Sequence, residues 1–198
     1  MTPSDAVVGF VVAGGHSRRM GRDMALLPWD GGTLLDHAIT RLGSVCREVR
    51  VLSGQELRYA DRGLPVHVDA IADGGPLAGL AAALSVAAPR PVLLLGVDMP
   101  FVPETLLAHV RDALAGWDAA VPELAEGAEP LCAAYAAACS APVQEALASG
   151  ERKMTSFWPR VRVRVLTDVD LARFGPAARL FRNLNDPYDY SAARRDNP

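Results

Sequence analysis

Cysteine and histidine are scarce in this 198-residue sequence. The three cysteines, Cys46, Cys132 and Cys139, are odd in number and lack the spacing of metal ligands, and the four histidines are scattered along the chain. This usage argues against a disulfide framework and against a structural metal. It favours a protein that works in a reducing, cytoplasmic compartment.

Excess charge and long apolar runs are also lacking. The formal net charge is −3, from 20 Lys and Arg against 23 Asp and Glu, so no global field would attract nucleic acid or an anionic membrane. The longest run of low polarity, 77–88, is too short to span a bilayer, and the opening MTPSD has no basic targeting stretch. We therefore expect a protein that binds neither nucleic acid nor membrane and confines any anion site to a local loop.

Strand-like and helix-like segments alternate along the chain. A length of 198 residues predicts one domain, 1–198, large enough for a sizeable core. The runs 7–12 and 91–97 are apolar throughout, as in strands buried on both faces, and 48–53 and 65–69 are further β-type runs. The pattern predicts an α/β fold, specifically a Rossmann-like three-layer sandwich with a mostly parallel sheet and helices on both faces.

Helical signals fill the gaps between these strands. Thr33 and Asp36 have the spacing of a capping box at the start of an amphipathic helix whose apolar face holds Leu34, Leu35, Ala38, Ile39 and Leu42. Further helices are expected at 77–88 and at 106–114, the latter entered through Pro103. Later in the chain we expect strands at 118–124 and 130–136, a largely helical 142–158, and an exposed strand at 160–166. The arginines of that last strand are interpreted as a solvated face rather than as an anion site.

Glycine and arginine are concentrated in the loop after the first strand, AGGHSRRMG at 13–21. Gly14 and Gly15 allow backbone N–H groups to converge on phosphate oxygens, and Arg18 or Arg19 can donate to two such oxygens. A glycine-rich turn beside solvated arginines is the alternative interpretation. The loop has neither P-loop spacing nor G-x-G-x-x-G, so it supports neither an ATPase nor a dinucleotide-dependent dehydrogenase.

Two more loops are expected at the same edge of the sheet, where open parallel sheets bind their ligands. The segment 96–103 places Asp98 after the most apolar strand, and one carboxylate with substrate phosphates is a usual way to hold Mg²⁺. An aspartate before Pro100 is also typical of a turn or helix cap. The segment 73–80, with Asp69 upstream, leads into the alanine-rich helix and offers backbone against which a flat base could lie, although Gly-Pro before a helix is ordinary.

Four motifs, taken together and in order, resemble the molybdenum cofactor guanylyltransferases. They are VAGGHSRRMG at 12–21, GPLAG at 75–79, VDMP at 97–100 and NLNDP at 183–187. This family of the nucleotidyltransferase superfamily joins GTP to molybdopterin phosphate with loss of pyrophosphate. The match covers nearly the whole chain. GPLAG and NLNDP are similar to the guanylyl members, whereas the first motif alone would also fit cytidylyl and sugar-nucleotide transferases.

The resemblance implies GTP as donor, molybdopterin or the molybdenum cofactor as acceptor, and Mg²⁺ held by Asp98. It makes Arg19 and Asp98 the catalytic residues. The nucleotide-binding residues it implies are Val12, Ala13, Gly14, Gly15, Met24, Asp69, Gly75, Pro76, Leu77, Gly79 and Asp98. It places Asn183, Asn185, Arg152 and Lys153 near the acceptor, the last two in a segment, 150–158, similar to a family helix. From the residues alone, the two asparagines favour a turn and the two cations a solvated first helical turn.

Two positions depart from the family pattern. Met24 stands where the family has a lysine, and Leu52 stands where an asparagine usually follows the second strand. Methionine cannot stabilise phosphate by charge, and it fits a gap-filling role beside Leu26 and Leu27. The alternatives are a slower enzyme, a degenerate nucleotide-binding adaptor in molybdoenzyme maturation, and a related nucleotidyltransferase with another base or acceptor. Retention of the metal-binding aspartate and of both asparagines favours the enzyme.

Overall fold

An eight-stranded, mostly parallel sheet forms the centre of the computed structural model, which describes residues 6–14, 21–69, 71 and 74–196. The strand order is β10-β7-β9-β6-β1-β4-β5, with β8 paired to β7. Among the described residues, seven pairs of adjacent strands make up this sheet; four are parallel, and the pairs of β9 with β6, β9 with β7 and β8 with β7 are antiparallel. The strands are β1 (Val8–Val12), β4 (Glu48–Leu52), β5 (Val66–His67), β6 (Val92–Gly96), β7 (Ala119–Leu124), β8 (Gly127–Ala128), β9 (Ala134–Tyr135) and β10 (Val163–Leu166).

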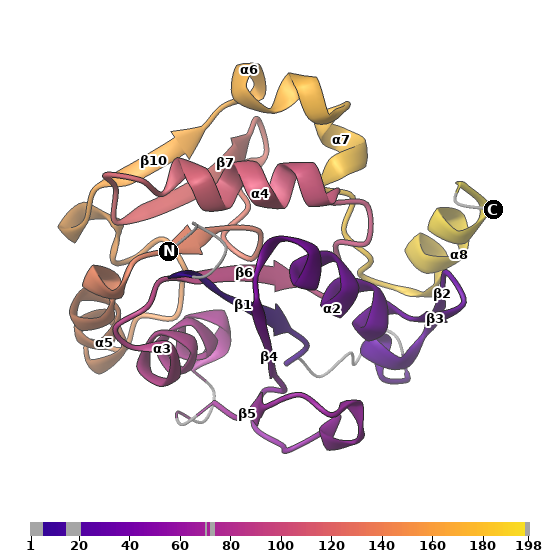
Figure 1. The fold of residues 1–198 in the computed structure, drawn as a ribbon, viewed down its shortest axis with the longest axis horizontal. Coiled ribbons are helices and arrows are strands. Elements are labelled where there is room, and N and C mark those ends of the chain that lie inside the picture. The colour runs from indigo at the N-terminus through magenta and orange to yellow at the C-terminus, as the bar shows by residue number, and fades with distance from the viewer. Residues whose placement is uncertain (1–5, 15–20, 70, 72–73, 197–198) are drawn as a thin grey trace.

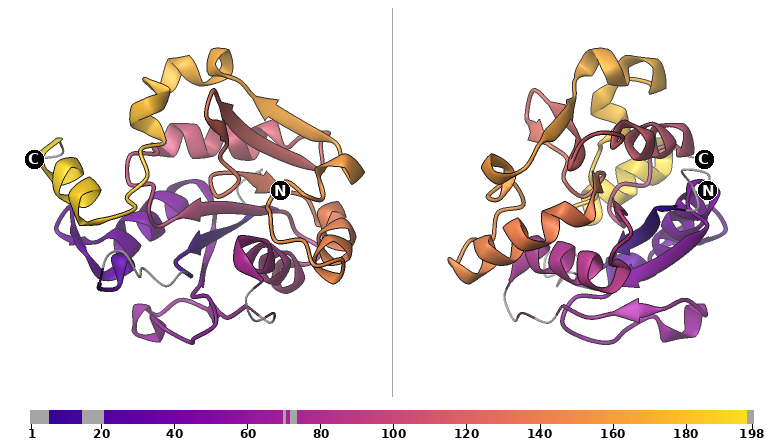
Figure 2. Two further views of the ribbon diagram at one scale, coloured as in Figure 1. Left: turned by 180° about the vertical axis from the view of Figure 1, so that it is seen from behind. Right: turned by 60° about the vertical axis from the view of Figure 1, so that its left-hand side comes forward.

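Helices cover both faces of the sheet (Figures 1 and 2). The helices α2 and α4 belong to one apolar core and α3 and α5 to the other. Their bounds, with those of the shorter C-terminal helices, are α2 (Leu34–Val45), α3 (Gly75–Ala87), α4 (Glu104–Ala113), α5 (Ser140–Ala148), α6 (Asp168–Leu171), α7 (Ala177–Leu180) and α8 (Pro187–Asp196). This arrangement is the three-layer α/β sandwich that the sequence predicts. None of the helices in the described residues is both long and apolar enough to cross a membrane.

The two apolar strands lie at the centre, as expected from their composition. All five residues of β6 are buried, and in β1 only Val12 is partly exposed. The alternating strand β10 lies at the edge of the sheet, where exposed Arg162 and Arg164 face solvent and pair with Asp118 and Asp170. The interpretation of these arginines as a solvated strand face is therefore confirmed.

Local signals also determine where helix α2 begins. Thr33 Oγ1 accepts a hydrogen bond from the Asp36 backbone N–H (3.2 Å), and the Thr33 N–H donates to Asp36 Oδ2 (3.0 Å). This reciprocal pair is the predicted capping box, and it satisfies two N–H groups that have no partner within the helix. A small hairpin, β2 (Pro28–Trp29) and β3 (Gly32–Thr33), leads the chain into this cap.

Three sequence predictions need correction. The segment 142–158 is not largely helical, because α5 ends at Ala148 and Gly150 adopts φ +83°, a left-handed conformation that glycine favours and that ends a helix. A short 3₁₀ helix, η4 (Trp158–Arg160), follows only at the end of that segment. GPLAG at 75–79 is not a loop but the first turns of α3. The strand expected at 130–136 shortens to Ala134–Tyr135 and runs antiparallel to both neighbours.

The order of the strands creates a ligand crevice. From β1 the chain moves outward to β4 and β5, and α3 then returns it to β6 on the other side of β1. The carboxyl ends of these strands lie level, because Val12 is in register with both Leu52 and Gly96. Loops that leave β1 in one direction and β6 in the other therefore diverge at this edge, which is where open α/β sheets bind ligands.

Candidate nucleotidyl-transfer site

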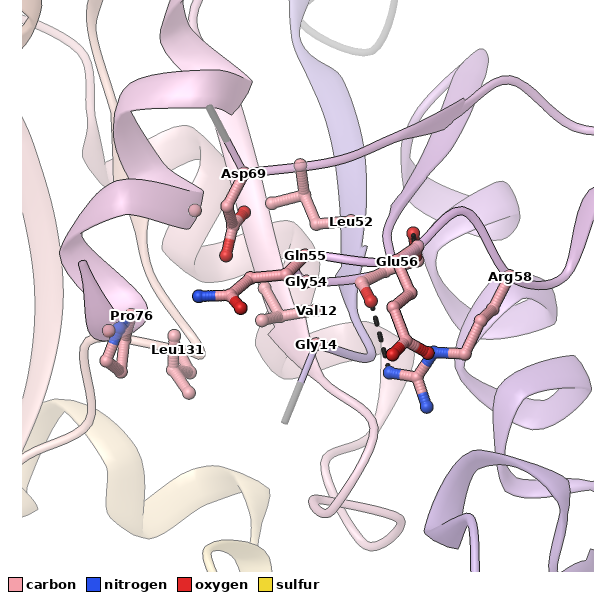
Figure 3. Close-up of a pocket in the computed structure, with 13 residues that line it drawn as sticks. Val12, Gly14, Leu52, Gly54, Gln55, Glu56, Arg58, Asp69, Pro76 and Leu131 are labelled. Atoms are coloured by element: carbon pink, nitrogen blue, oxygen red, sulfur yellow. Dashed lines mark hydrogen bonds between the residues drawn. The ribbon is translucent and has the colours of Figure 1, made fainter. Parts of the chain in front are cut away.

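A cavity of about 420 Å³ opens at the carboxyl ends of β1, β4 and β5 (Figure 3). Six residues implied by the resemblance line it, drawn from three of the motifs or their flanks: Val12, Gly14, Asp69, Gly75, Pro76 and Gly79. The Leu77 side chain does not, because it is fully buried in the core beneath α3. Leu52, where the family usually has asparagine, contributes an apolar wall.

A smaller cavity of about 130 Å³ adjoins the first on the β6 side. Val12, Gly14 and Leu131 line both cavities, so the two share a boundary at the end of β1. Ala13, Met24 and Asp98 line the smaller one together with Asp23. The structure thus places the expected nucleoside residues on one side of the β1 loop and the expected metal ligand on the other. Gly15 and Arg19 lie outside the described residues.

Gly14 is required by a close approach between two loops. A Cβ atom at this position would stand 2.5 Å from the backbone nitrogen of Gly54 and 2.6 Å from its Cα. The Ala13 N–H donates to the Leu52 carbonyl oxygen (2.9 Å), which continues the β1–β4 ladder into this contact. The start of the loop that follows β1 is therefore fixed against the turn that follows β4.

Arg58 ties the same two loops together and was not identified from the sequence. Its guanidinium donates to Asp23 Oδ2 (3.0 Å) and to the carbonyl oxygens of Ser53 (3.1 Å) and Ala13 (3.3 Å). The Tyr59 hydroxyl donates to the same Asp23 carboxylate (2.8 Å). Asp23 in turn caps the short 3₁₀ helix η1 (Met24–Leu26), whose first residue is Met24. The position of Met24 is thus set by the ion pair of Asp23 with Arg58, two residues that lie 35 positions apart in the sequence.

Asp98 follows β6 and carries a partly buried carboxyl group. Gly96 is needed beside it, since a Cβ there would overlap Asp98 Oδ1. Burial raises the pKa of the Asp98 carboxyl, and no cationic side chain among the described residues offsets this shift. A bound cation would supply the missing positive charge. The described residues hold no cluster of three or more His, Cys, Asp or Glu side chains suited to a metal, so the protein would supply no more than one or two carboxylates here. That suits Mg²⁺, which commonly takes one or two carboxylates with phosphates and water.

The motif NLNDP meets this site from the far end of the chain. The Leu184 N–H donates to the Asp98 carbonyl oxygen (2.9 Å), which places Asn183 beside Asp98. Asn183 Oδ1 is buried and has no partner in the described part of the chain, so it can accept a hydrogen bond from a ligand. Asn185 is exposed, and its N–H donates to Asp189 Oδ2 (3.0 Å) at the start of α8. The turn interpretation also holds, since Asp186 caps α8.

Glu129 is a second residue that sequence analysis missed. The Asn183 side chain hydrogen-bonds to its carboxylate, and burial together with the nearby charge of Asp98 raises the pKa of Glu129 to about 7. Its only sequence signal is its position just before Pro130 and Leu131, the latter a residue of both cavities. Two carboxylates and a carboxamide therefore meet on the β6 side of the site.

Arg152 and Lys153 lie in an irregular segment rather than in the family-like helix expected at 150–158. Arg152 borders the start of α3, because a Cβ on Gly75 would be 3.8 Å from the Arg152 carbonyl oxygen. Its guanidinium donates to the Glu151 (2.8 Å) and Leu147 (3.3 Å) carbonyl oxygens at the end of α5. Lys153 is exposed. Arg152 therefore lies beside Gly75 of the larger cavity and lines neither cavity itself.

The whole arrangement matches one known family. The family model described as the MobA-like NTP transferase domain matches residues 9–165. The chain belongs to this MobA-like family. The assignment agrees with the resemblance drawn from the four motifs, and the match spans both cavities from the β1 loop to β10.

Curated and solved relatives of this MobA-like chain cover nearly its full length. It is 36% identical to the probable molybdenum cofactor guanylyltransferase of Pelotomaculum thermopropionicum, over 94% of this chain and 91% of that protein. It is 30% identical to the molybdenum cofactor guanylyltransferase of Desulfosudis oleivorans, over 91% of each. The crystal structure of molybdopterin-guanine dinucleotide biosynthesis protein A from Archaeoglobus fulgidus aligns with a TM-score of 0.81 at 24% identity, covering 96% of this chain and 98% of that one. The predicted fold class is thereby confirmed.

Glu129 gives this MobA-like protein a testable pH dependence. Its folded-state pKa of about 7 lies above the ordinary 4.5, so the folded state holds a proton that the unfolded state releases earlier. The free energy of unfolding should therefore fall as the pH rises from about 4.5 to 7, and it should level off at higher pH. We expect Glu129→Gln to remove this contribution, on the order of 1 kcal/mol at pH 8, because partial exposure screens the effect.

Melting temperatures from pH 5 to 8 without divalent metal measure this effect. The exposed Glu151→Gln is the matched control and should follow the parent protein at every pH. Parallel curves for Glu129→Gln and the parent protein would show that the Glu129 carboxyl ionises normally.

Proposed function

We propose that this chain is a guanylyltransferase that transfers GMP from GTP to molybdopterin, or to the molybdenum cofactor, and releases pyrophosphate. The names of its curated relatives support the reaction, and the convergence of the motif residues supports it in this chain. The observation that carries the proposal is that Val12, Gly14, Asp69, Asp98 and Asn183, from four separate motifs or their flanks, meet at one edge of the sheet.

The reaction requires positioning and charge neutralisation more than covalent help. An acceptor phosphate oxygen forms a bond to the α-phosphorus of GTP, and the bond from that phosphorus to the bridging oxygen of the β-phosphate breaks, so pyrophosphate leaves. The acceptor phosphate is already an anion at neutral pH, so no general base is needed. Backbone N–H groups of the β1 loop would bind the phosphates, and Arg19 of the same motif would add positive charge.

Asp98 is the residue we assign to Mg²⁺. Its partly buried carboxylate without a cationic neighbour, and its place on the β6 side of the β1 loop, fit a hard divalent cation that phosphates also ligate. When bound, Mg²⁺ supplies positive charge to the phosphates as charge develops. Asn183, hydrogen-bonded to Glu129, would present its free carbonyl oxygen on this side of the site.

The acceptor is assigned to the side of the site formed by Asn183 and Asn185. The hydrogen bond from the Leu184 N–H to the Asp98 carbonyl oxygen supports this assignment, because it holds residues 183–185 beside Asp98. Arg152 lies beside Gly75 of the larger cavity, so for Arg152 and the adjacent Lys153 we propose a contact with phosphates only at the rim of that cavity.

The second candidate is a nucleotide-binding adaptor that acts with molybdoenzyme maturation proteins and does not catalyse the transfer. One observation favours it: Met24 lines the smaller cavity where the family has a lysine, so this position supplies no charge there. Incubation with molybdopterin, Mg²⁺ and each of the four nucleoside triphosphates, with release of pyrophosphate measured, separates the two candidates. The enzyme releases pyrophosphate with GTP, and the adaptor releases none.

Preference for the guanine base is the associated binding prediction. We expect GTP to bind more tightly than ATP or CTP, because the guanine N1–H and N2 amino donors suit the Asp69 carboxylate at the rim of α3. Calorimetric titration of the three nucleotides in the presence of Mg²⁺ measures this preference. Equal affinity for CTP would remove the guanylyl assignment and leave the fold unaffected.

A further inference from the structure

Three polar side chains that line the larger cavity, Gln55, Glu56 and Asp69, have no hydrogen bond or ion pair to another described residue. Among the described residues that line it, Ser53 Oγ donates to the Glu56 carbonyl oxygen (2.7 Å), and Arg58 is tied to three oxygens of the loops. In contrast, Asp69 Oδ1 is buried with no partner in the described chain. Gln55 is exposed, and no hydrogen bond joins its carboxamide to another described residue. Gln55 also has the only carboxamide among the described residues lining this cavity.

The backbone places Gln55 and Asp69 next to each other. Gly54, the neighbour of Gln55, adopts φ +77°, and its carbonyl oxygen accepts a hydrogen bond from the Asp69 N–H (2.7 Å). The close contact of Gly14 with the Gly54 backbone holds the same turn against the end of β1. In Figure 3 the Gln55 carboxamide and the Asp69 carboxylate both point into the cavity on the side of Pro76, whereas Glu56 and Arg58 lie together on the opposite side.

We propose that Gln55 is a specificity-determining residue of this site and that its carboxamide reads the Watson–Crick edge of guanine beside Asp69. The inference rests on the proposed use of the cavity for GTP. The amide N–H donates to guanine O6, while the Asp69 carboxylate accepts from N1–H and the N2 amino group. Adenine presents the opposite pattern, with an N6 donor toward Gln55 and an N1 acceptor toward the carboxylate. A carboxamide can also turn its oxygen toward the N6 amino group, so the opposition to adenine comes from the Asp69 carboxylate facing N1, while Gln55 adds the contact to guanine O6.

Gln55 also lies close in sequence to Leu52, the position at which the family pattern has an asparagine. Leu52, which replaces that asparagine, lines the same cavity three residues earlier and cannot hydrogen-bond to a base. The turn at 53–56 brings the Gln55 amide into the cavity that Leu52 also lines (Figure 3). An amide thus remains available to a base, supplied from a different position of the chain.

Calorimetric titrations of Gln55→Leu and Gln55→Glu with GTP, ITP and ATP test the proposal. We expect Gln55→Leu to weaken GTP binding about tenfold and ATP binding less than twofold, in line with loss of one hydrogen bond to the base. Gln55→Glu should weaken GTP further, since a carboxylate repels O6, and should narrow or reverse the preference over ATP. ITP keeps O6 but lacks the N2 amino group, so it should lose as much affinity as GTP in Gln55→Leu.

The other glutamine of the chain provides the control. Gln144 is exposed on α5 and lies outside the cavity, so Gln144→Leu should bind all three nucleotides as the parent protein does. If the parent protein prefers GTP and Gln55→Leu keeps that preference, the role of Gln55 is overturned while the proposed function stands. If the parent protein binds no nucleoside triphosphate, both are overturned. Unchanged ITP affinity in Gln55→Leu alongside weaker GTP would overturn the assignment to O6.

Discussion

Asp98→Asn is expected to abolish Mg²⁺-dependent release of pyrophosphate while leaving the fold intact. The amide keeps the shape of the side chain but loses the negative charge that a hard cation requires. We expect turnover to fall by at least about 10²-fold, the scale on which losing one charge-stabilising group acts. Pyrophosphate release under saturating GTP and acceptor, measured over a range of Mg²⁺ concentrations, checks the loss.

A second expectation concerns the melting temperature of Asp98→Asn without metal. Burial raises the pKa of Asp98, so its ionised form destabilises the metal-free folded state above that pKa, and asparagine removes this cost. The melting temperature without metal should therefore stay the same or rise at pH 8. Asp61→Asn is the matched control, since that side chain is 77% exposed and lines neither cavity, and both turnover and melting temperature should be unchanged. Unfolding of Asp98→Asn, or normal turnover, would identify Asp98 as a structural cap.

Met24→Lys is expected to accelerate guanylyl transfer and to tighten GTP binding. The gap-filling interpretation of Met24 is incomplete, because its half-buried side chain contacts the core yet also lines the smaller cavity with Asp23 and Asp98. Its neighbour Leu26 is 46% exposed and does not enclose it. Lysine has a similar length, so its ammonium would enter a cavity that already holds two carboxylates.

The expected gain is several-fold up to about 10²-fold in rate, since a donor aimed at developing charge is worth about 10²–10³ at best. The gain should weaken as salt rises, because ions screen the partly exposed charge. Met24→Gln is the control for length and polarity without charge, and it should gain little. Rate, GTP affinity and melting temperature are measured together. A lower melting temperature without faster transfer would mean that the cavity cannot hold an ammonium, because a charge buried without a partner costs stability.

Much of the fold follows from short-range signals in the sequence. The runs of apolar residues in β1 and β6 indicate strands with two buried faces, because a strand can satisfy its backbone only within a sheet while both rows of side chains pack against helices. The Thr33 and Asp36 pair specifies the start of α2 by two hydrogen bonds within four residues. Gly14, Asp69 and Asp98 were recognisable because each follows a strand whose carboxyl end could be located from the pattern.

The tertiary structure alone decided which side chains meet. Helix α5 ends ten residues before the predicted limit of 158, because Gly150 takes a left-handed conformation that the alanine-rich pattern does not reveal. Glu129 and Asn183, like Arg58 and Asp23, belong to segments far apart in the chain, and only the strand order brings them to one edge. Gln55 lies beside Asp69 because the Asp69 N–H donates a hydrogen bond to the carbonyl oxygen of the adjacent Gly54. Sequence patterns record local geometry, whereas contacts between distant segments depend on how layers pack, and no single segment encodes that packing.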